Sequence, residues 1–107
     1  MRKKKLYAID FDGTLCRCAW PEIGKPRFVM LWWVRQMQGK HDWILWTCRE
    51  GDSLVLAVMW CQRHGLYPVC ANKNPASQIK LFGNDSRKVG ADRYVDDKAQ
   101  RWIRLLP

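Results

Sequence analysis

The chain has 107 residues, of which 48% are apolar, and its 19 Lys and Arg residues exceed its 10 Asp and Glu residues for a formal net charge of +9. A chain of this length holds one domain, residues 1–107, and not two. No apolar run approaches the roughly 20 residues that cross a bilayer, and the basic start lacks the apolar stretch of a secretory signal. Five Cys residues without regular spacing predict free thiols in a reducing compartment, so we expect a cytoplasmic protein with no membrane partner.

The first half of the chain predicts a strand, a helix and a second strand. Residues 6–9 form an apolar run that ends at Asp10 and is typical of a buried parallel strand. Pro26 suits a helix start, and an apolar pattern of helical period follows it until Gly39. Residues 43–46 repeat the strand signal. The helical pattern consists of Met30, Trp33, Val34 and Met37.

The first predicted helix is apolar on nearly all its faces. Phe28, Val29, Leu31 and Trp32 occupy the positions outside the main apolar stripe. A domain of this size has little depth in which to bury a whole helix. We therefore expect a subunit interface, and hence a homo-oligomer, on this Trp- and Met-rich helix. The adjacent Trp pair, in the middle of a helix, favours core or interface over a surface for stacking bases.

The second half of the chain predicts a helix and weaker elements. Asp52 or Ser53 can cap a helix that Gly65 ends, with an apolar face of Leu54, Ala57, Val58 and Cys61. Three elements follow: strands at residues 67–70 and 94–95, and a final helix from Lys98 to Leu106. The alternation of strands and helices predicts an α/β sandwich with four or five strands in a mostly parallel sheet.

Polar side chains follow three of the predicted strands. Asp10 and Asp12 come after the first, Thr47 after the second, and Asp96 and Asp97 after the last. The ends of parallel strands share one edge of the sheet, where ligands bind. Asp10 and Asp12 lie on one side of an extended chain, and four carboxylates in one place require a cation. Oxygen ligands without His or Cys favour Mg²⁺ over Zn²⁺.

Carboxylates beside a metal ion suit phosphoryl transfer through an aspartyl-phosphate. One Asp attacks phosphorus, cationic groups neutralise the phosphoryl oxygens, and the other Asp protonates the leaving alcohol and then activates water. Gly13 permits a sharp turn whose backbone N–H groups can face a phosphate. Thr47 offers a hydroxyl and Cys48 a backbone N–H. Arg49 can reach a substrate anion, although a solvated loop Arg is an equal interpretation.

These segments resemble the motifs of the haloacid dehalogenase superfamily. Residues 10–15, Asp-Phe-Asp-Gly-Thr-Leu, are similar to its first motif, residues 43–47 to its second, and Asp96-Asp97 to its fourth. The third motif is a lone Lys, which Lys88 matches best, with Lys73, Lys80 and Lys98 as competitors. Over most of its length the chain is similar to a group of small capless bacterial and phage hydrolases in that superfamily.

The resemblance implies a three-layer Rossmann-like sandwich and a Mg²⁺-dependent phosphatase that acts on a phosphorylated substrate. An acid at position 12 distinguishes phosphatases from the dehalogenases and ion-pumping ATPases of the superfamily. It implies that Asp10 is the nucleophile and a metal ligand, and that Asp12 is the general acid and base and a metal ligand through its backbone carbonyl. It also implies that Asp96 ligates the metal directly and that Asp97 ligates it through water or supports another ligand. Thr47 and Lys88 are then the residues that bind the phosphoryl group.

The short segments between these motifs leave no room for a cap domain. Residues 13–46 and 48–87 must each hold a helix and a strand. An uncapped site is open to solvent, so we expect either a macromolecular phosphate or a neighbouring subunit as its lid. Trp20 and Glu22 lie in the segment expected to cover the site, where they can shape the substrate pocket. Packing of Trp20 against the sheet edge is an equal interpretation.

Three functions therefore stay open, in a definite order. The first is hydrolysis of a small phosphorylated metabolite. The second is phosphatase action on nucleic-acid ends, which the +9 charge and the open site permit but do not favour. The third is a binding module that has the fold but no activity. A zinc site of Cys16, Cys18, Cys61 and His64 matches no common spacing, so we interpret these Cys residues as buried apolar thiols.

Overall fold

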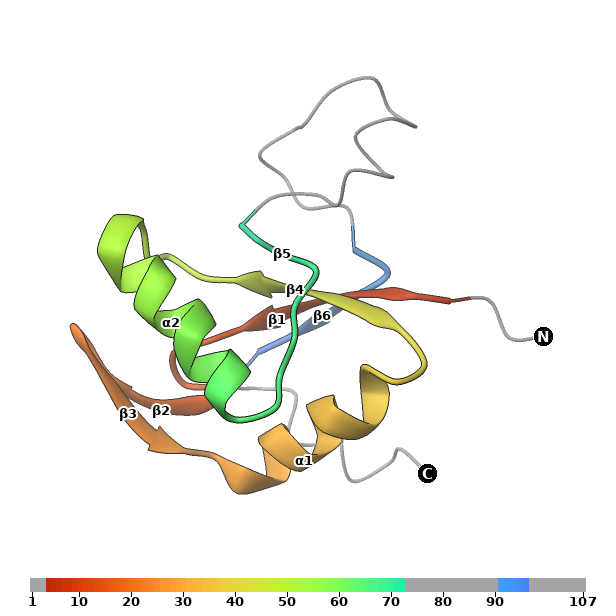
Figure 1. Ribbon diagram of the computed structural model, residues 1–107, viewed down its shortest axis with the longest axis horizontal. Helices are drawn as coiled ribbons and strands as arrows, with labels where there is room; N and C mark the ends of the chain where they lie inside the picture. The colour runs from red at the N-terminus through yellow and green to blue at the C-terminus, as the bar shows by residue number, and fades with distance from the viewer. Residues whose placement is uncertain (1–3, 73–90, 97–107) are drawn as a thin grey trace, which may run out of the picture.

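The computed structural model describes residues 4–72 and 91–96 and has an α/β fold (Figure 1). Four parallel strands form one sheet in the order β5-β4-β1-β6, and an antiparallel hairpin, β2–β3, forms a second sheet. Lys88, Asp97 and the final helix expected from residue 98 lie outside the described residues. The elements are β1 (Leu6–Asp10), β2 (Cys16–Ala19), β3 (Glu22–Pro26), α1 (Phe28–Met37), β4 (Asp42–Trp46), α2 (Gly51–Arg63), β5 (Cys70–Ala71) and β6 (Arg93–Val95).

The strongly patterned segments form the elements that the sequence predicts. The runs at 6–9 and 43–46 are β1 and β4, and the two helical patterns are α1 and α2. The strand predicted at residues 67–70 is displaced, since β5 begins only at Cys70. Pro68 lacks an N–H group for a strand ladder, and the N–H of Tyr67 bonds to the Gln38 side chain instead.

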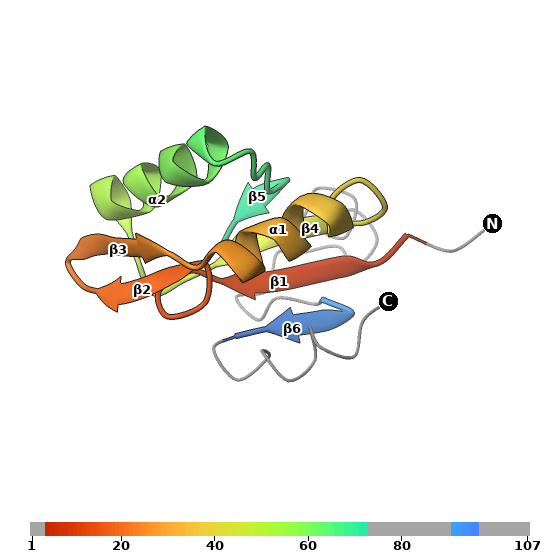
Figure 2. The same cartoon turned by 90° about the horizontal axis from the view of Figure 1, so that it is seen from below.

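The hairpin formed by β2 and β3 is absent from the prediction. Its sequence has no regular apolar alternation, and most of its side chains are exposed. Gly24 makes the pairing possible, because a Cβ at this position would collide with the backbone carbonyl of Arg17. Figures 1 and 2 both show the hairpin beyond the carboxyl end of β1, so this unpredicted element stands next to the predicted site.

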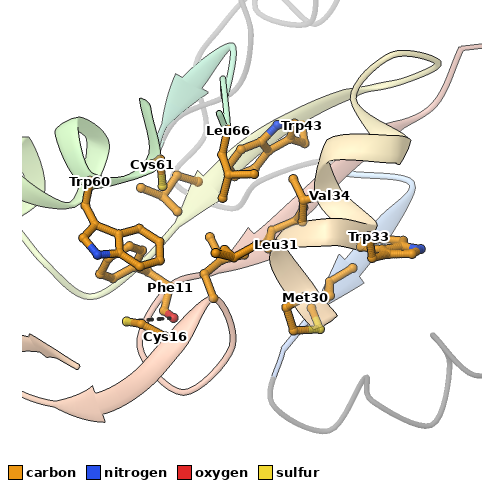
Figure 3. Close-up of a cluster of buried hydrophobic side chains, with 14 of the residues drawn as sticks. Phe11, Cys16, Met30, Leu31, Trp33, Val34, Trp43, Trp60, Cys61 and Leu66 are labelled. Atoms are coloured by element: carbon orange, nitrogen blue, oxygen red, sulfur yellow. Dashed lines mark hydrogen bonds between the residues drawn. The ribbon is translucent and has the colours of Figure 1, made fainter. Parts of the chain in front are cut away.

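Both helices pack on one face of the parallel sheet (Figure 2). Side chains alternate along a strand, so Ile9, Trp43 and Leu45 face the helices while Leu6, Ala8 and Ile44 face the other way. Figure 3 shows how side chains from the two helices meet over the sheet. The helix residues in this core are Met30, Leu31, Trp33, Val34 and Met37 of α1 and Ala57, Trp60 and Cys61 of α2.

The outer face of α1 is apolar and open. Phe28, Val29 and Trp32 are 72%, 67% and 58% exposed, whereas Trp33 is buried in the core. Exposed apolar groups of this size on one helix face are typical of a contact surface. The homo-oligomer expected from this helix stays a prediction, which the mass of the protein in solution tests. Among the described residues no helix is long and apolar enough to cross a membrane.

Candidate active site

The predicted site residues emerge together at one edge of the parallel sheet. Asp10 is the last residue of β1, and Thr47 and Asp96 directly follow β4 and β6. The register pairs Asp10 with Trp46, and Ile9 with Val95, so the three polar residues leave adjacent strands at nearly the same level. The central position of β1 therefore places Asp10 between Thr47 and Asp96, as the strand order required.

A tight turn follows β1 and carries Asp12. The carbonyl of Phe11 accepts the N–H groups of Thr14, Leu15 and Cys16 at 3.1, 3.0 and 3.5 Å. Gly13 has a φ of 87°, a conformation that favours glycine. Its N–H donates to the Cys16 carbonyl at 2.8 Å, so this donor is already used within the turn. Gly13 thus contributes its backbone conformation to the turn, and the expectation that N–H groups of this turn face a phosphate stays a prediction.

Arg49 makes a bidentate ion pair with Asp12. Its Nε donates to Oδ2 and its Nη2 to Oδ1, both at 2.8 Å. The Arg49 side chain is 1% exposed and that of Asp12 is 20% exposed. The hydrogen bonds to Asp12 are the main cause that raises the pKa of Arg49. This arrangement differs from both sequence interpretations of Arg49, because the guanidinium is buried and its donors bind protein groups rather than water or a substrate.

The same guanidinium also holds the tip of the β2–β3 hairpin, residues 20–22. Nη1 donates to the Pro21 carbonyl at 3.2 Å and Nη2 to the Glu22 carbonyl at 2.9 Å. The ring centroid of Trp20 lies 4.9 Å from the guanidinium carbon, and that of Phe11 lies 5.3 Å from it. Arg49 therefore connects Asp12 to the hairpin tip through one buried cation.

Thr47 and Asn72 fix the segment that carries Arg49. The Thr47 hydroxyl accepts the Arg49 N–H at 3.1 Å and keeps its own hydrogen for donation. The Asn72 side chain accepts the Thr47 N–H at 2.7 Å and donates to the Arg49 carbonyl at 3.2 Å. Sequence reasoning missed Asn72. Its φ of 55° is one that Asn tolerates better than most residues, and an Asn directly after a strand was the available signal.

The proposed metal ligands are only partly described. Among residues 4–72 and 91–96, no three His, Cys, Asp or Glu side chains lie close enough to share an ion. The expected set contains the carboxylates of Asp10 and Asp96, the backbone carbonyl of Asp12, and Asp97, which lies outside that part of the chain. Three oxygen donors on neighbouring segments have the hard chemistry that Mg²⁺ prefers. The alternative zinc site does not form, although its three Cys residues and His64 are all described.

None of the five Cys side chains forms a disulfide, as predicted, but the interpretation of Cys16, Cys18 and Cys61 as buried thiols is wrong for Cys18, which lies on the exposed strand β2. Burial raises the pKa of Cys16 to about 11 and that of Cys61 to about 12, whereas Cys18 and Cys48 are exposed. We expect a disulfide reagent at about pH 8 to modify Cys18 and Cys48 fast and Cys16 and Cys61 only after denaturation. Labelling that is quenched after set times, followed by peptide mapping, measures the modification rate of each thiol. Fast labelling of Cys61 in the native protein would contradict the burial of this residue.

Comparison with known proteins gives one informative match. No family model matches the chain, and neither does any curated protein. A conserved protein from Bacteroides thetaiotaomicron has a solved structure that superposes with a TM-score of 0.78 at 36% sequence identity. The alignment covers 90% of this chain and 78% of that one. Such identity over most of both chains means that the chain belongs to the same family as this conserved Bacteroides protein.

Proposed function

We propose that the protein is a Mg²⁺-dependent phosphomonoester hydrolase that works through an aspartyl-phosphate on Asp10, with a small phosphorylated metabolite as substrate. The observation that carries the proposal is the edge of the sheet at which Asp10, Thr47 and Asp96 leave adjacent parallel strands. The resemblance of these segments to haloacid dehalogenase motifs supports it, and the parallel α/β sheet is compatible with that fold. Five Cys residues without a disulfide fit a cytoplasmic enzyme.

The metal would be held by the carboxylates of Asp10 and Asp96 and the backbone carbonyl of Asp12, with Asp97 as a further ligand. When bound, the ion supplies positive charge that offsets the negative charge of the phosphoryl oxygens. Thr47 offers a hydroxyl donor at the same edge, and the backbone N–H of Cys48 is a second candidate donor. Lys88, which lies outside the described residues, is the proposed cationic partner of the phosphoryl group.

The reaction then proceeds in two displacements on phosphorus. A carboxylate oxygen of Asp10 forms a bond to phosphorus, the bond to the leaving oxygen breaks, and Asp12 gives that oxygen a proton. In the second step Asp12 takes a proton from water, the water oxygen bonds to phosphorus, and the bond to Asp10 breaks with release of phosphate. Each oxygen of Asp12 accepts from Arg49 through one lone pair, so the second lone pair is the one that carries the transferred proton.

The decisive experiment is hydrolysis of an aryl phosphate by the purified protein with Mg²⁺ and with EDTA. We expect phosphate release that requires Mg²⁺, since the carboxylates at the sheet edge repel an anionic substrate without a cation. Release that persists in EDTA would contradict the metal-dependent mechanism. No release by a folded protein that binds Mg²⁺ would favour a binding module without activity.

A nucleic-acid end is the second candidate substrate, and the hairpin is the observation that favours it. Arg17 and Lys25 are exposed on β2 and β3, and Trp20 is exposed at the tip between them. Basic side chains around an aromatic ring are typical of surfaces that bind single strands. This candidate predicts that oligonucleotides with a terminal phosphate are turned over faster than sugar phosphates and that added salt strongly slows the reaction.

A further inference from the structure

We propose that Arg49 positions the hairpin tip so that Trp20 forms a stacking surface beside Asp12, and that this surface selects phosphomonoesters whose leaving alcohol carries a planar aromatic ring. The inference rests on the proposed phosphatase function and adds the class of leaving group to it. It assigns Arg49 as a positioning residue, because the guanidinium acts through Asp12 and Trp20 and not on the phosphate.

The contacts of Arg49 fix the distance between the hairpin tip and Asp12. Nε and Nη2 of the guanidinium each donate one hydrogen bond to Asp12, while Nη1 donates to the Pro21 carbonyl and Nη2 also donates to the Glu22 carbonyl. The group is planar and donates in fixed directions, so these four bonds define one relative placement of the two segments. At 1% exposure the guanidinium also has little access to water as an alternative partner.

Trp20 differs from the Trp residues of the core. Trp43, Trp60 and Trp33 are 1%, 7% and 8% exposed, whereas Trp20 is 58% exposed although it lies on the guanidinium. Packing of Trp20 against the sheet edge, the alternative from the sequence, does not account for so open a ring. A large apolar ring that a buried cation holds in place at the surface is preorganised for contact with a ligand.

The position of Trp20 relative to Asp12 indicates which part of a substrate it contacts. In the proposed reaction Asp12 protonates the leaving oxygen, so the leaving group begins at Asp12 and extends away from Asp10. One guanidinium separates the Asp12 carboxylate from the Trp20 ring. Because four of the five N–H donors of this guanidinium bind protein oxygens and its side chain is only 1% exposed, the contact offered to a leaving group here is aromatic rather than ionic.

The test compares a nucleoside 5′-monophosphate with ribose 5-phosphate, two substrates that share the primary 5′-oxygen of ribose as the leaving oxygen but differ in whether the leaving alcohol carries a planar base. We expect Trp20→Ala to lower kcat/KM for the nucleotide by about 10-fold to 100-fold and for ribose 5-phosphate by less than about 2-fold. Trp20→Phe should keep most of the preference. Tyr67→Ala is the matched control, since Tyr67 is 61% exposed elsewhere on the surface, and it should change neither value.

Arg49→Lys tests the positioning role, because Lys keeps the charge but cannot make the four bonds together. We expect it to reduce the nucleotide preference as Trp20→Ala does, at a melting temperature that still shows a folded protein. An unchanged preference in Trp20→Ala, in an enzyme that hydrolyses aryl phosphate, would overturn the inference and leave the phosphatase intact. If neither substrate is hydrolysed, the affinity of the nucleotide for the wild type and for Trp20→Ala is compared by calorimetry. Equal affinities would overturn the inference. Weaker binding by Trp20→Ala would support the stacking surface but not the phosphatase function.

Discussion

Asp10→Asn is expected to lower phosphate release from an aryl phosphate by at least about 10³-fold. The amide lacks the negative charge and the nucleophilicity that attack on phosphorus requires, and it removes one of the carboxylates proposed to hold Mg²⁺. The fold should be retained, because Asn has nearly the same shape and Asp10 ends β1 at the edge of the sheet. Initial rates at saturating Mg²⁺, with a circular dichroism melt of each protein, measure the effect.

Asp42→Asn is the matched control for this prediction. Asp42 begins β4 at the opposite end of the sheet, paired in register with Leu6, and makes an exposed ion pair with Lys4 at 3.2 Å. Such a pair contributes about 0–1 kcal/mol, so Asp42→Asn should change activity by less than about 2-fold and stability only slightly. Full activity in Asp10→Asn would show that the phosphoryl group is not transferred to Asp10.

The second large effect concerns the free energy of unfolding. Asp12→Ala is expected to lower it by about 3–5 kcal/mol, because it leaves the 1% exposed guanidinium of Arg49 without its counterion. Arg49→Met should cost less, since water can reach the 20% exposed Asp12 side chain and the Met side chain fills part of the space. Urea unfolding followed by Trp fluorescence measures both values.

The double variant Asp12→Ala with Arg49→Met separates the charge effect from lost packing. It should be more stable than Asp12→Ala alone, because no buried charge is left without a partner. The hydrogen bonds to Asp12 raise the pKa of Arg49 above its ordinary range, so the stability that the charged guanidinium contributes is lost only as the pH rises through that higher pKa. The loss caused by Asp12→Ala should therefore be nearly constant between about pH 6 and pH 9. A loss below about 1 kcal/mol would mean that the pair is not formed in solution.

Much of the fold could be predicted from local patterns. Short apolar runs predict the strands at residues 6–9 and 43–46, and apolar residues at helical spacing predict the two helices. Few other structures can bury the apolar residues of these patterns. The hairpin could not be found in this way. Its strands are short and mostly exposed, and its tip is held by Arg49, which lies far along the chain.

The residues of the candidate site likewise fall into those that the sequence could predict and those that it could not. Asp10, which ends β1, and Thr47 and Asp96, which directly follow β4 and β6, could be placed at one edge because the carboxyl ends of parallel strands lie at the same edge of a sheet. Asn72 was missed because its two hydrogen bonds to the Thr47 N–H and the Arg49 carbonyl depend on where β5 ends. The partner of the Gly13 N–H, the Cys16 carbonyl, could not be predicted either, because it is fixed by how the turn closes.

Arg49 shows most clearly where local pattern stops being informative. The amino-acid order alone established the parallel α/β sheet and the polar edge, because apolar periodicity and strand ends are local properties of a chain. Whether an Arg in a loop is solvated, binds an anion or pairs with an Asp depends on which groups surround it after folding. Here tertiary packing set the Asp12 carboxylate, two hairpin carbonyls and the Trp20 ring around one buried guanidinium. A buried charge must find such partners, and partners that lie far apart in the sequence are brought together only by the fold.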